Sequence, residues 1–196
     1  MGKLYVLMGK SATGKDTLLY TLLHQKEIDI KGVIPYTTRP IRSGETHGKE
    51  YFFLTQEEMY ELEEQKKVIE CRKYDTVHGP WFYFTVDDGQ IDLKKGDYAM
   101  ISTLEGYLKI RRHFGKENVV PIYITVDDST RLERALERER RQKMPCIAEV
   151  CRRYLADEGD FSTERLEEAE ISGGIVNDTI EHAMEQLLLL IRKKNI

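Results

Sequence analysis

A glycine-rich segment near the N-terminus has the residue types and the spacing to bind phosphate groups. Gly9, Gly14 and Lys15 fit the pattern G-x-x-x-x-G-K, and they follow an apolar run at residues 4–8. Glycines allow positive φ angles, so the backbone can wrap around phosphates with its N–H groups pointing inward, while Lys15 reaches the outer phosphates. The strand and helix expected on either side argue against a chance glycine-rich turn. We predict that the phosphates of ATP bind to the run Gly9, Lys10, Ser11, Ala12, Thr13, Gly14, Lys15, Asp16 and Thr17.

The residue after the lysine departs from the usual form of this motif. A serine or threonine normally stands there and binds Mg²⁺ through its hydroxyl, but this chain has Asp16 followed by Thr17. A carboxylate is also a good Mg²⁺ ligand, so we expect Asp16 and Thr17 to bind the metal or to support a group that does. The same carboxylate adds negative charge beside a triphosphate, which would weaken nucleotide binding.

A second cluster of chemically capable residues lies in the polar segment 36–54. Arg39 and Arg42 stand three residues apart, close to Glu45 and Tyr51. Arginine forks suit a phosphate held through two parallel hydrogen bonds, and the tyrosine hydroxyl can add another phosphate contact. A carboxylate suits a base edge that offers N–H donors. The cluster therefore indicates a small anionic ligand that carries a purine.

This segment resembles the signature of the guanylate kinase family. The positions that match its spacing are Thr37, Thr38, Arg39, Arg42, Glu45, Gly48, Tyr51 and Phe53. The phosphate loop and the C-terminal Ile-Val-Asn-Asp run also fall where the family has them, so the resemblance covers the whole chain in outline. It implies that Arg39, Arg42, Tyr51 and Tyr83 hold the phosphate of GMP, and that Asn177 lies near the adenine of ATP. Asn177 could equally be a helix N-cap.

The resemblance also places two residues on the guanine base. Glu70 would accept hydrogen bonds from N1–H and N2–H₂, and the Thr85 hydroxyl would donate to O6. Adenine offers the opposite pattern and would leave a buried Glu70 unpaired, so such a pocket can discriminate strongly. The chain departs from the family pattern at Phe84, which replaces a glycine, and at Thr103 and Glu105, which replace an acid and a glutamine.

An arginine-rich stretch follows residue 129. Arg131, Arg134, Arg138 and Arg141 fall within about 80° of one another on a helical wheel. The stretch resembles the family's lid, whose arginines close over ATP, and the transition state of phosphoryl transfer needs this kind of positive charge. We expect Arg138, Arg141 and Arg152 to be catalytic along with Lys15 and Arg42. The alternative is a solvated face stitched together by Glu–Arg pairs.

Hydrophobic periodicity predicts the elements that position these residues. We expect strands at 4–8, 50–55, 68–74, 81–90, 98–103, 119–126 and 173–178, and helices at 17–26, 55–67, 104–114, 129–143 and from 180 onward. A loop is expected at 35–48 and another around His78, Gly79 and Pro80. The alternation of strand and helix predicts an α/β fold with a parallel sheet. Joined with the resemblance, it predicts one domain: a P-loop NTPase-type sheet with flanking helices as the core (1–34, 86–128 and 161–196), an acceptor-binding insertion (35–85) and a lid (129–160).

Composition sets broader limits. The 196 residues are 40% hydrophobic and 33% charged, with a formal net charge of −4, which is the balance of a globular protein and argues against a dedicated nucleic-acid binder. The apolar runs are too short to cross a bilayer, no signal peptide is evident, and the three cysteines lack metal-site spacing. We expect a cytoplasmic monomer or homodimer that binds neither nucleic acid nor membranes.

The resemblance implies Mg²⁺-dependent phosphoryl transfer from ATP to GMP, with dGMP as another acceptor, by positioning and charge neutralisation and without a covalent intermediate. Two alternatives stay open at this point. One is a non-catalytic guanylate-kinase-like module that binds phosphorylated ligands, although such modules usually lose the phosphate loop. The other is a kinase of the same fold that acts on a different phosphorylated acceptor.

Overall fold

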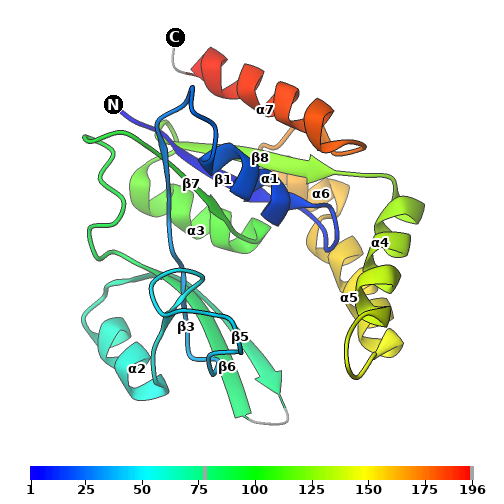
Figure 1. Ribbon diagram of the computed structural model, residues 1–196. Coiled ribbons are helices and arrows are strands. Elements are labelled where there is room, and N and C mark those ends of the chain that lie inside the picture. The colour runs from blue at the N-terminus through cyan, green and yellow to red at the C-terminus, as the bar shows by residue number, and fades with distance from the viewer. Residues whose placement is uncertain (77–78, 195–196) are drawn as a thin grey trace. The chain divides into compact units, whose positions relative to one another are not determined.

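A computed structural model of the chain describes residues 1–76 and 79–194 (Figure 1). The described residues divide into two compact units. Unit 1 comprises Met1–Tyr5, Asp29–Met100 and Glu105–Val120, and unit 2 comprises Val6–Ile28, Ile101–Leu104 and Pro121–Ile196. Among the described residues, the helices are all too short or too polar to span a membrane.

The larger sheet has five strands in the order β2-β7-β1-β8-β9. Their bounds are β1 Leu4–Met8, β2 Ile30–Gly32, β7 Asp97–Ile101, β8 Val119–Thr125 and β9 Ile175–Val176. The pairs β2–β7 and β8–β9 are parallel. All five residues of β1 are buried, as expected for a continuous apolar strand covered on both faces. The predicted α/β fold with a parallel sheet and flanking helices is confirmed.

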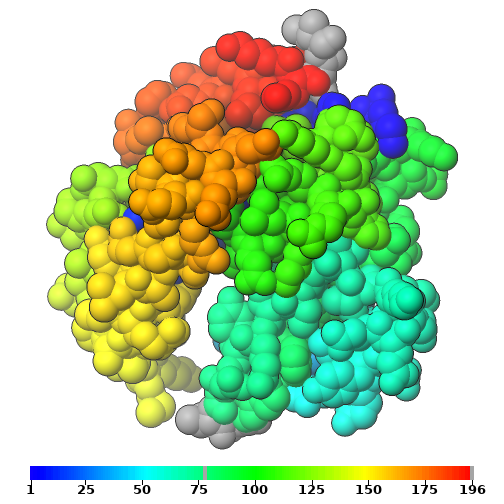
Figure 2. Space-filling model, turned by 180° about the vertical axis from the view of Figure 1, so that it is seen from behind, coloured from blue at the N-terminus to red at the C-terminus, as the bar shows by residue number. Residues whose placement is uncertain are grey.

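Among the described residues, unit 2 holds most of the helices. These helices are α1 Lys15–Leu23, α4 Asp128–Arg140, α5 Ile147–Asp160, α6 Thr163–Glu168 and α7 Ile180–Lys194. Helix α1 packs against α7, and α4 packs against α5. The apolar stripe of α7 is buried, as its spacing of three and four residues predicts. Figure 2 shows α5 in yellow and α6 in orange as neighbours on the surface of this unit.

In unit 1, a four-stranded sheet has the order β4-β3-β6-β5. The bounds are β3 Tyr36–Thr37, β4 Phe52–Phe53, β5 Val68–Thr76 and β6 Gly79–Val86, and this unit also holds α2 Gln56–Glu64 and most of α3 Leu104–Phe114. Strands β5 and β6 form a long antiparallel pair. A small core of Met59, Phe82, Phe84 and Val86 joins α2 to one face of the sheet.

Several predicted boundaries are confirmed and others are wrong. The capping box of Thr55 and Glu58 opens α2 as predicted, because each residue bonds the backbone N–H of the other. The expected strand at 50–55 shrinks to β4, and the expected loop at 35–48 contains β3. Of the loop expected at 78–80, residue 78 lies outside the described residues, whereas Gly79 and Pro80 begin β6. Elements β2, α5 and α6 were not predicted from the sequence.

Candidate functional site

The glycine loop lies where β1 ends and α1 begins. Gly14 has φ +82°, and a Cβ atom there would lie 2.3 Å from the Asn177 Nδ2 atom. A Cβ on Gly9 would lie 2.4 Å from the Ile124 carbonyl oxygen. Both positions therefore require glycine. The loop passes directly into α1, whose first-turn N–H groups and dipole favour an anion.

Lys15 lies at the start of α1 among other charged groups. Its ammonium donates to the Lys10 carbonyl oxygen at 3.3 Å. Burial lowers the pKa of Lys15, the negative charges of Asp16 and Asp157 oppose that shift, and the positive charges of Arg153 and Arg138 add to it. The charges of Arg153 and Arg138 therefore act on Lys15, and those of Asp16 and Asp157 act on it more strongly in the opposite direction.

Helix α5 is hydrogen-bonded to the first half of the phosphate loop. The Ser11 N–H donates to the Asp157 carboxylate at 2.7 Å, and Arg153 donates to the Ser11 hydroxyl at 3.1 Å. The Lys10 ammonium donates to the Glu158 carboxylate at 2.7 Å. These contacts join residues 142 to 148 positions apart in the chain, and they hold the loop to the helix through charge-assisted hydrogen bonds.

Arg131 of α4 pairs with the same two carboxylates that bind the phosphate loop. It is 1% exposed, and its guanidinium donates to Glu158 at 2.6 Å and to Asp157 at 3.2 Å. It also pairs with Asp128 at 3.0 Å and lies 4.0 Å from the ring centroid of Tyr154. Arg131 therefore compensates the carboxylates that hold the loop. The sequence placed Arg131 on the arginine face of the helix but assigned it no role.

The other predicted lid arginines have different surroundings. Arg138 is exposed, and its positive charge helps to lower the pKa of Lys15. Arg152 is exposed and donates to both carboxylate oxygens of Glu149 at 2.7 Å. Arg141 is also exposed and lies 4.0 Å from Glu137. Catalytic roles for these three arginines stay predictions, and Arg153, which was not predicted, makes the direct contact with the loop.

The signal that could have found the α5 residues was present in the sequence. Val150, Tyr154 and Glu158 recur every fourth residue, which is a helical spacing. That spacing would have predicted α5 and placed Glu158 on the same face as the buried Val150. It would not have identified the phosphate loop as the partner of that face.

Asn177 lies against the loop. It is 1% exposed, and its amide nitrogen Nδ2 donates to the Thr13 carbonyl oxygen at 2.7 Å. Its backbone N–H donates to the Thr125 carbonyl oxygen, and its own carbonyl accepts from Arg134 at 3.2 Å. The side-chain oxygen makes no hydrogen bond with the described residues. Asn177 thus ties the end of β9 to the phosphate loop, and its predicted place beside adenine stays a prediction.

Oxygen atoms for a cation are available at the loop. Asp16 and Thr17 lie in the first turn of α1, and both are exposed. The described residues contain no group of three or more His, Cys, Asp or Glu side chains suited to a metal. Mg²⁺ commonly takes one or two protein oxygens and completes its shell with phosphate and water. The donors at the loop fit that mode of binding.

In unit 1, Arg39 and Glu45 form the centre of the second cluster. Arg39 is 3% exposed, and its two terminal nitrogens donate to the two carboxylate oxygens of Glu45 at 2.9 and 2.8 Å. The backbone N–H of Arg42 donates to the same carboxylate at 2.8 Å. The hydrogen bonds from Arg39 lower the pKa of Glu45 to about 2. Glu45 is therefore a fixed anion that holds both arginine positions in place.

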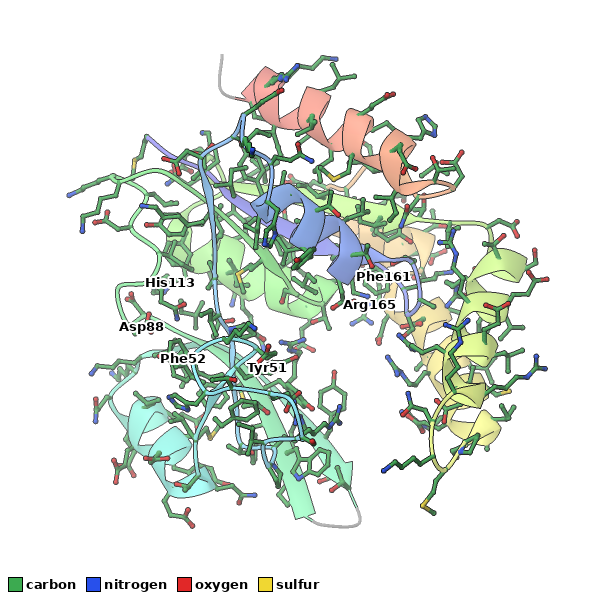
Figure 3. The ribbon with its side chains drawn as sticks, in the orientation of Figure 1. Tyr51, Phe52, Asp88, His113, Phe161 and Arg165 are labelled. Carbon is green, nitrogen blue, oxygen red and sulfur yellow. The ribbon has the colours of Figure 1, made fainter. Side chains whose placement is uncertain are left out.

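Two tyrosines border this pair. The Arg39 guanidinium lies 5.4 Å from the ring centroid of Tyr51, and the rings of Tyr51 and Tyr83 meet edge to face at 5.8 Å. The hydrogen bond to Glu45 raises the pKa of Arg39, and Tyr83 adds to that effect. Tyr51, labelled in Figure 3, comes from the segment just before β4. The structure thus brings Arg39, Arg42, Glu45, Tyr51 and Tyr83 together.

Glu70 and Thr85 meet on the neighbouring strands β5 and β6. Each is 2% exposed, and they pair directly in the antiparallel register. The Thr85 hydroxyl donates to Glu70 Oε1 at 2.8 Å. Arg72, which was not predicted as a site residue, places its Nε atom 3.2 Å from Glu70 Oε2. A buried carboxylate with a hydroxyl and a guanidinium beside it can recognise a ligand edge that carries N–H donors.

Comparison with known proteins agrees with this arrangement. The guanylate kinase family model matches residues 1–194. A guanylate kinase of Trichodesmium erythraeum is 32% identical over 189 residues, which cover 95% of this chain and 94% of the relative. A guanylate kinase of Fusobacterium nucleatum is 28% identical over 193 residues, covering 97% and 96%. The crystal structure of guanylate kinase from Anaplasma phagocytophilum shares the fold, with a TM-score of 0.62 at 24% identity over 98% of this chain and 86% of that chain.

Proposed function

The chain belongs to the guanylate kinase family, and we propose that it transfers a phosphoryl group from ATP to GMP, giving ADP and GDP. The observation that carries the proposal is the coexistence of two sites in one chain. Unit 2 keeps a complete phosphate loop with Lys15, and unit 1 holds the Arg39–Glu45 pair and the buried Glu70. A module that only binds phosphorylated ligands has no need of the first site, so the loop favours catalysis.

In the proposed reaction, the donor phosphates lie on the main-chain N–H groups of the loop and the start of α1. Lys15, Arg138 and Arg153 spread positive charge over the oxygens of the phosphoryl group as it moves. Magnesium bound with Asp16 and Thr17 would neutralise charge on the donor phosphates. The carboxylates of Asp157 and Glu158 accept from the Ser11 N–H and the Lys10 ammonium, so they hold the first half of the loop against α5.

The acceptor is held by the second cluster. Arg39, Arg42, Tyr51 and Tyr83 bind the phosphate of GMP, and Glu45 orients the Arg39 guanidinium and fixes the backbone at Arg42. Because the phosphate oxygen of GMP is already a nucleophile at neutral pH, the protein has to position it and needs no covalent intermediate. Glu70 accepts from the N1–H and N2–H₂ groups of guanine. Location in the cytoplasm and a monomeric or dimeric state stay predictions.

A coupled spectrophotometric assay of ADP formation tests the proposal. Purified protein with ATP and Mg²⁺ is offered GMP, dGMP, AMP and ribose 5-phosphate as acceptors. We expect turnover with GMP, slower turnover with dGMP and background rates with AMP and ribose 5-phosphate. Lys15→Met should lower kcat by at least about 100-fold, since it removes a cation from the transition state. Preference for the sugar phosphate, or ATP-independent binding of GMP without turnover, would contradict the proposal.

A further inference from the structure

Four polar side chains share one face of the β5–β6 pair. In the antiparallel register Glu70 pairs with Thr85, and Arg72 pairs with Tyr83. Alternate residues of a strand point to the same face, so these four lie together. The intervening residues, among them Phe84, belong to the core on the opposite face with α2. Arg72 is therefore on the ligand-facing side of the sheet beside Glu70.

Arg72 and Glu70 form an ion pair with unused hydrogen-bonding capacity. Arg72 Nε lies 3.2 Å from Glu70 Oε2, and Arg72 Nη2 donates weakly to Glu70 Oε1 at 3.4 Å. The Glu70 side chain is 1% exposed and that of Arg72 is 22% exposed. Despite their proximity, Arg72 Nε and Glu70 Oε2 are both buried without a well-aligned hydrogen bond among the described residues. Buried polar atoms of this kind ordinarily have a partner.

The Thr85 hydroxyl is already engaged. It donates its single proton to Glu70 Oε1 at 2.8 Å. A hydroxyl has one proton to donate, so Thr85 cannot donate to a guanine O6 atom while it keeps this bond. If Glu70 accepts from the N1–H and N2–H₂ groups of guanine and keeps its bond from Thr85, the donor for O6 has to come from another side chain on this face. Arg72 carries five N–H donors next to the carboxylate.

We propose that Arg72 donates to guanine O6 while Glu70 accepts from N1–H and N2–H₂, and that Thr85 acts as a positioning residue for Glu70. The inference rests on the proposed function. Together Arg72 and Glu70 present one donor beside two acceptor oxygens, and this pattern complements the guanine edge. Adenine places an amino group where guanine has O6, so it would set donor against donor at Arg72 and leave Glu70 without N1–H.

The test compares GMP with 6-thio-GMP, in which a weakly accepting sulfur replaces O6 and the two N–H groups remain. The measured quantity is the ratio of kcat/KM for GMP to kcat/KM for 6-thio-GMP. In the unaltered protein we expect GMP to be favoured. In Arg72→Met, kcat/KM for GMP should fall about 10- to 100-fold, the range for a hydrogen bond to a charged group, while that for 6-thio-GMP changes little. The ratio therefore approaches one.

Thr85→Val distinguishes the two possible readers of O6. If Thr85 only positions Glu70, this variant lowers kcat/KM for GMP and kcat/KM for 6-thio-GMP by the same factor. The ratio of the two then stays unchanged. Lys73→Met serves as a matched control, because it removes one positive charge from the next residue of β5. Lys73 lies on the opposite face of the strand and pairs with Asp75 at 3.0 Å. Lys73→Met should change kcat/KM for neither GMP nor 6-thio-GMP. A ratio that collapses in Thr85→Val and survives in Arg72→Met would overturn the inference.

Removal of Arg72 leaves Glu70 buried without the guanidinium that now pairs with it, so folding needs its own check. Arg72→Lys keeps the charge but replaces the fork with a single point donor, and it should give an intermediate ratio. Thermal unfolding of each variant shows whether the fold is retained. An Arg72→Lys protein that folds and keeps the full preference for GMP also contradicts the inference. Absence of turnover with GMP in the unaltered protein would instead contradict the proposed function.

Discussion

Replacement of Arg131 by methionine is expected to destabilise the protein strongly. Arg131 is almost fully buried, and its guanidinium compensates Asp157 and Glu158, which in turn hold the phosphate loop. Removal of one partner of a buried ion pair costs about 3–5 kcal/mol. Asp157 is 15% exposed and Glu158 is 41% exposed, so water relieves part of the cost and the lower end applies. Loss of the contact with the Tyr154 ring adds about 1 kcal/mol.

We therefore expect a loss of about 3–4 kcal/mol, which for a chain of this length lowers Tm by roughly 6–16 °C. Differential scanning calorimetry measures the shift. Methionine keeps the apolar stem of arginine, so the loss reports on the guanidinium. Because the network ends on the phosphate loop, the KM for ATP should rise while the KM for GMP stays unchanged.

Arg165→Met is the matched control. Arg165, labelled in Figure 3, pairs with Asp160 at 3.0 Å, but both side chains are about half exposed or more. Exposed pairs contribute at most about 1 kcal/mol, so Tm should fall by no more than roughly 4 °C. Arg131→Lys should lie between the two, because it keeps the charge and loses the fork. Equal shifts in Arg131→Met and Arg165→Met would refute the reasoning.

Three further outcomes follow from local features. Gly14→Ala should abolish ATP binding in calorimetry and leave GMP binding intact, because its Cβ would lie 2.3 Å from Asn177 Nδ2 at φ +82°; retained ATP affinity would show that the loop tolerates a side chain. The pKa of Glu45 is about 2 in the folded protein and ordinarily 4.5. Its contribution to the free energy of unfolding is therefore complete above pH 4.5 and is lost as pH falls toward 2. Glu45→Gln should flatten the dependence of Tm on pH in that window, and an unchanged slope would argue against it. Burial raises the pKa of Cys71 to about 11, so a thiol reagent at pH 8 should modify the exposed Cys146 and Cys151 quickly and Cys71 about 100-fold more slowly.

The phosphate loop was predictable from the sequence because its physics is local. The apolar residues of β1, the glycines and Lys15 are contiguous, and each glycine answers a backbone requirement that no other residue meets. The same holds for the capping box of Thr55 and Glu58, whose two hydrogen bonds span three residues. Spacing and residue type determine features of this kind.

The acceptor cluster was predictable in its membership, since Arg39, Glu45 and Tyr51 lie close together in the chain. The sequence did not show which group each side chain binds. The resemblance implied that the Thr85 hydroxyl donates to guanine, and that role stays a prediction. The register of β5 and β6 also places this hydroxyl 2.8 Å from Glu70 Oε1 and brings Arg72 to the same face, which the sequence did not show. A one-residue slip would send Arg72 to the opposite face, and register depends on turns and packing outside the motif.

Tertiary structure alone decided which charges of the arginine-rich segment act together. Sequence periodicity identified a positive helix face, but it could not separate the buried Arg131 from the exposed Arg138 and Arg141. The contact of Ser11 with Asp157 joins residues 146 positions apart. Long charged side chains take partners from whatever element packs beside them, so their roles follow from the packing of α4, α5 and the loop rather than from their own spacing.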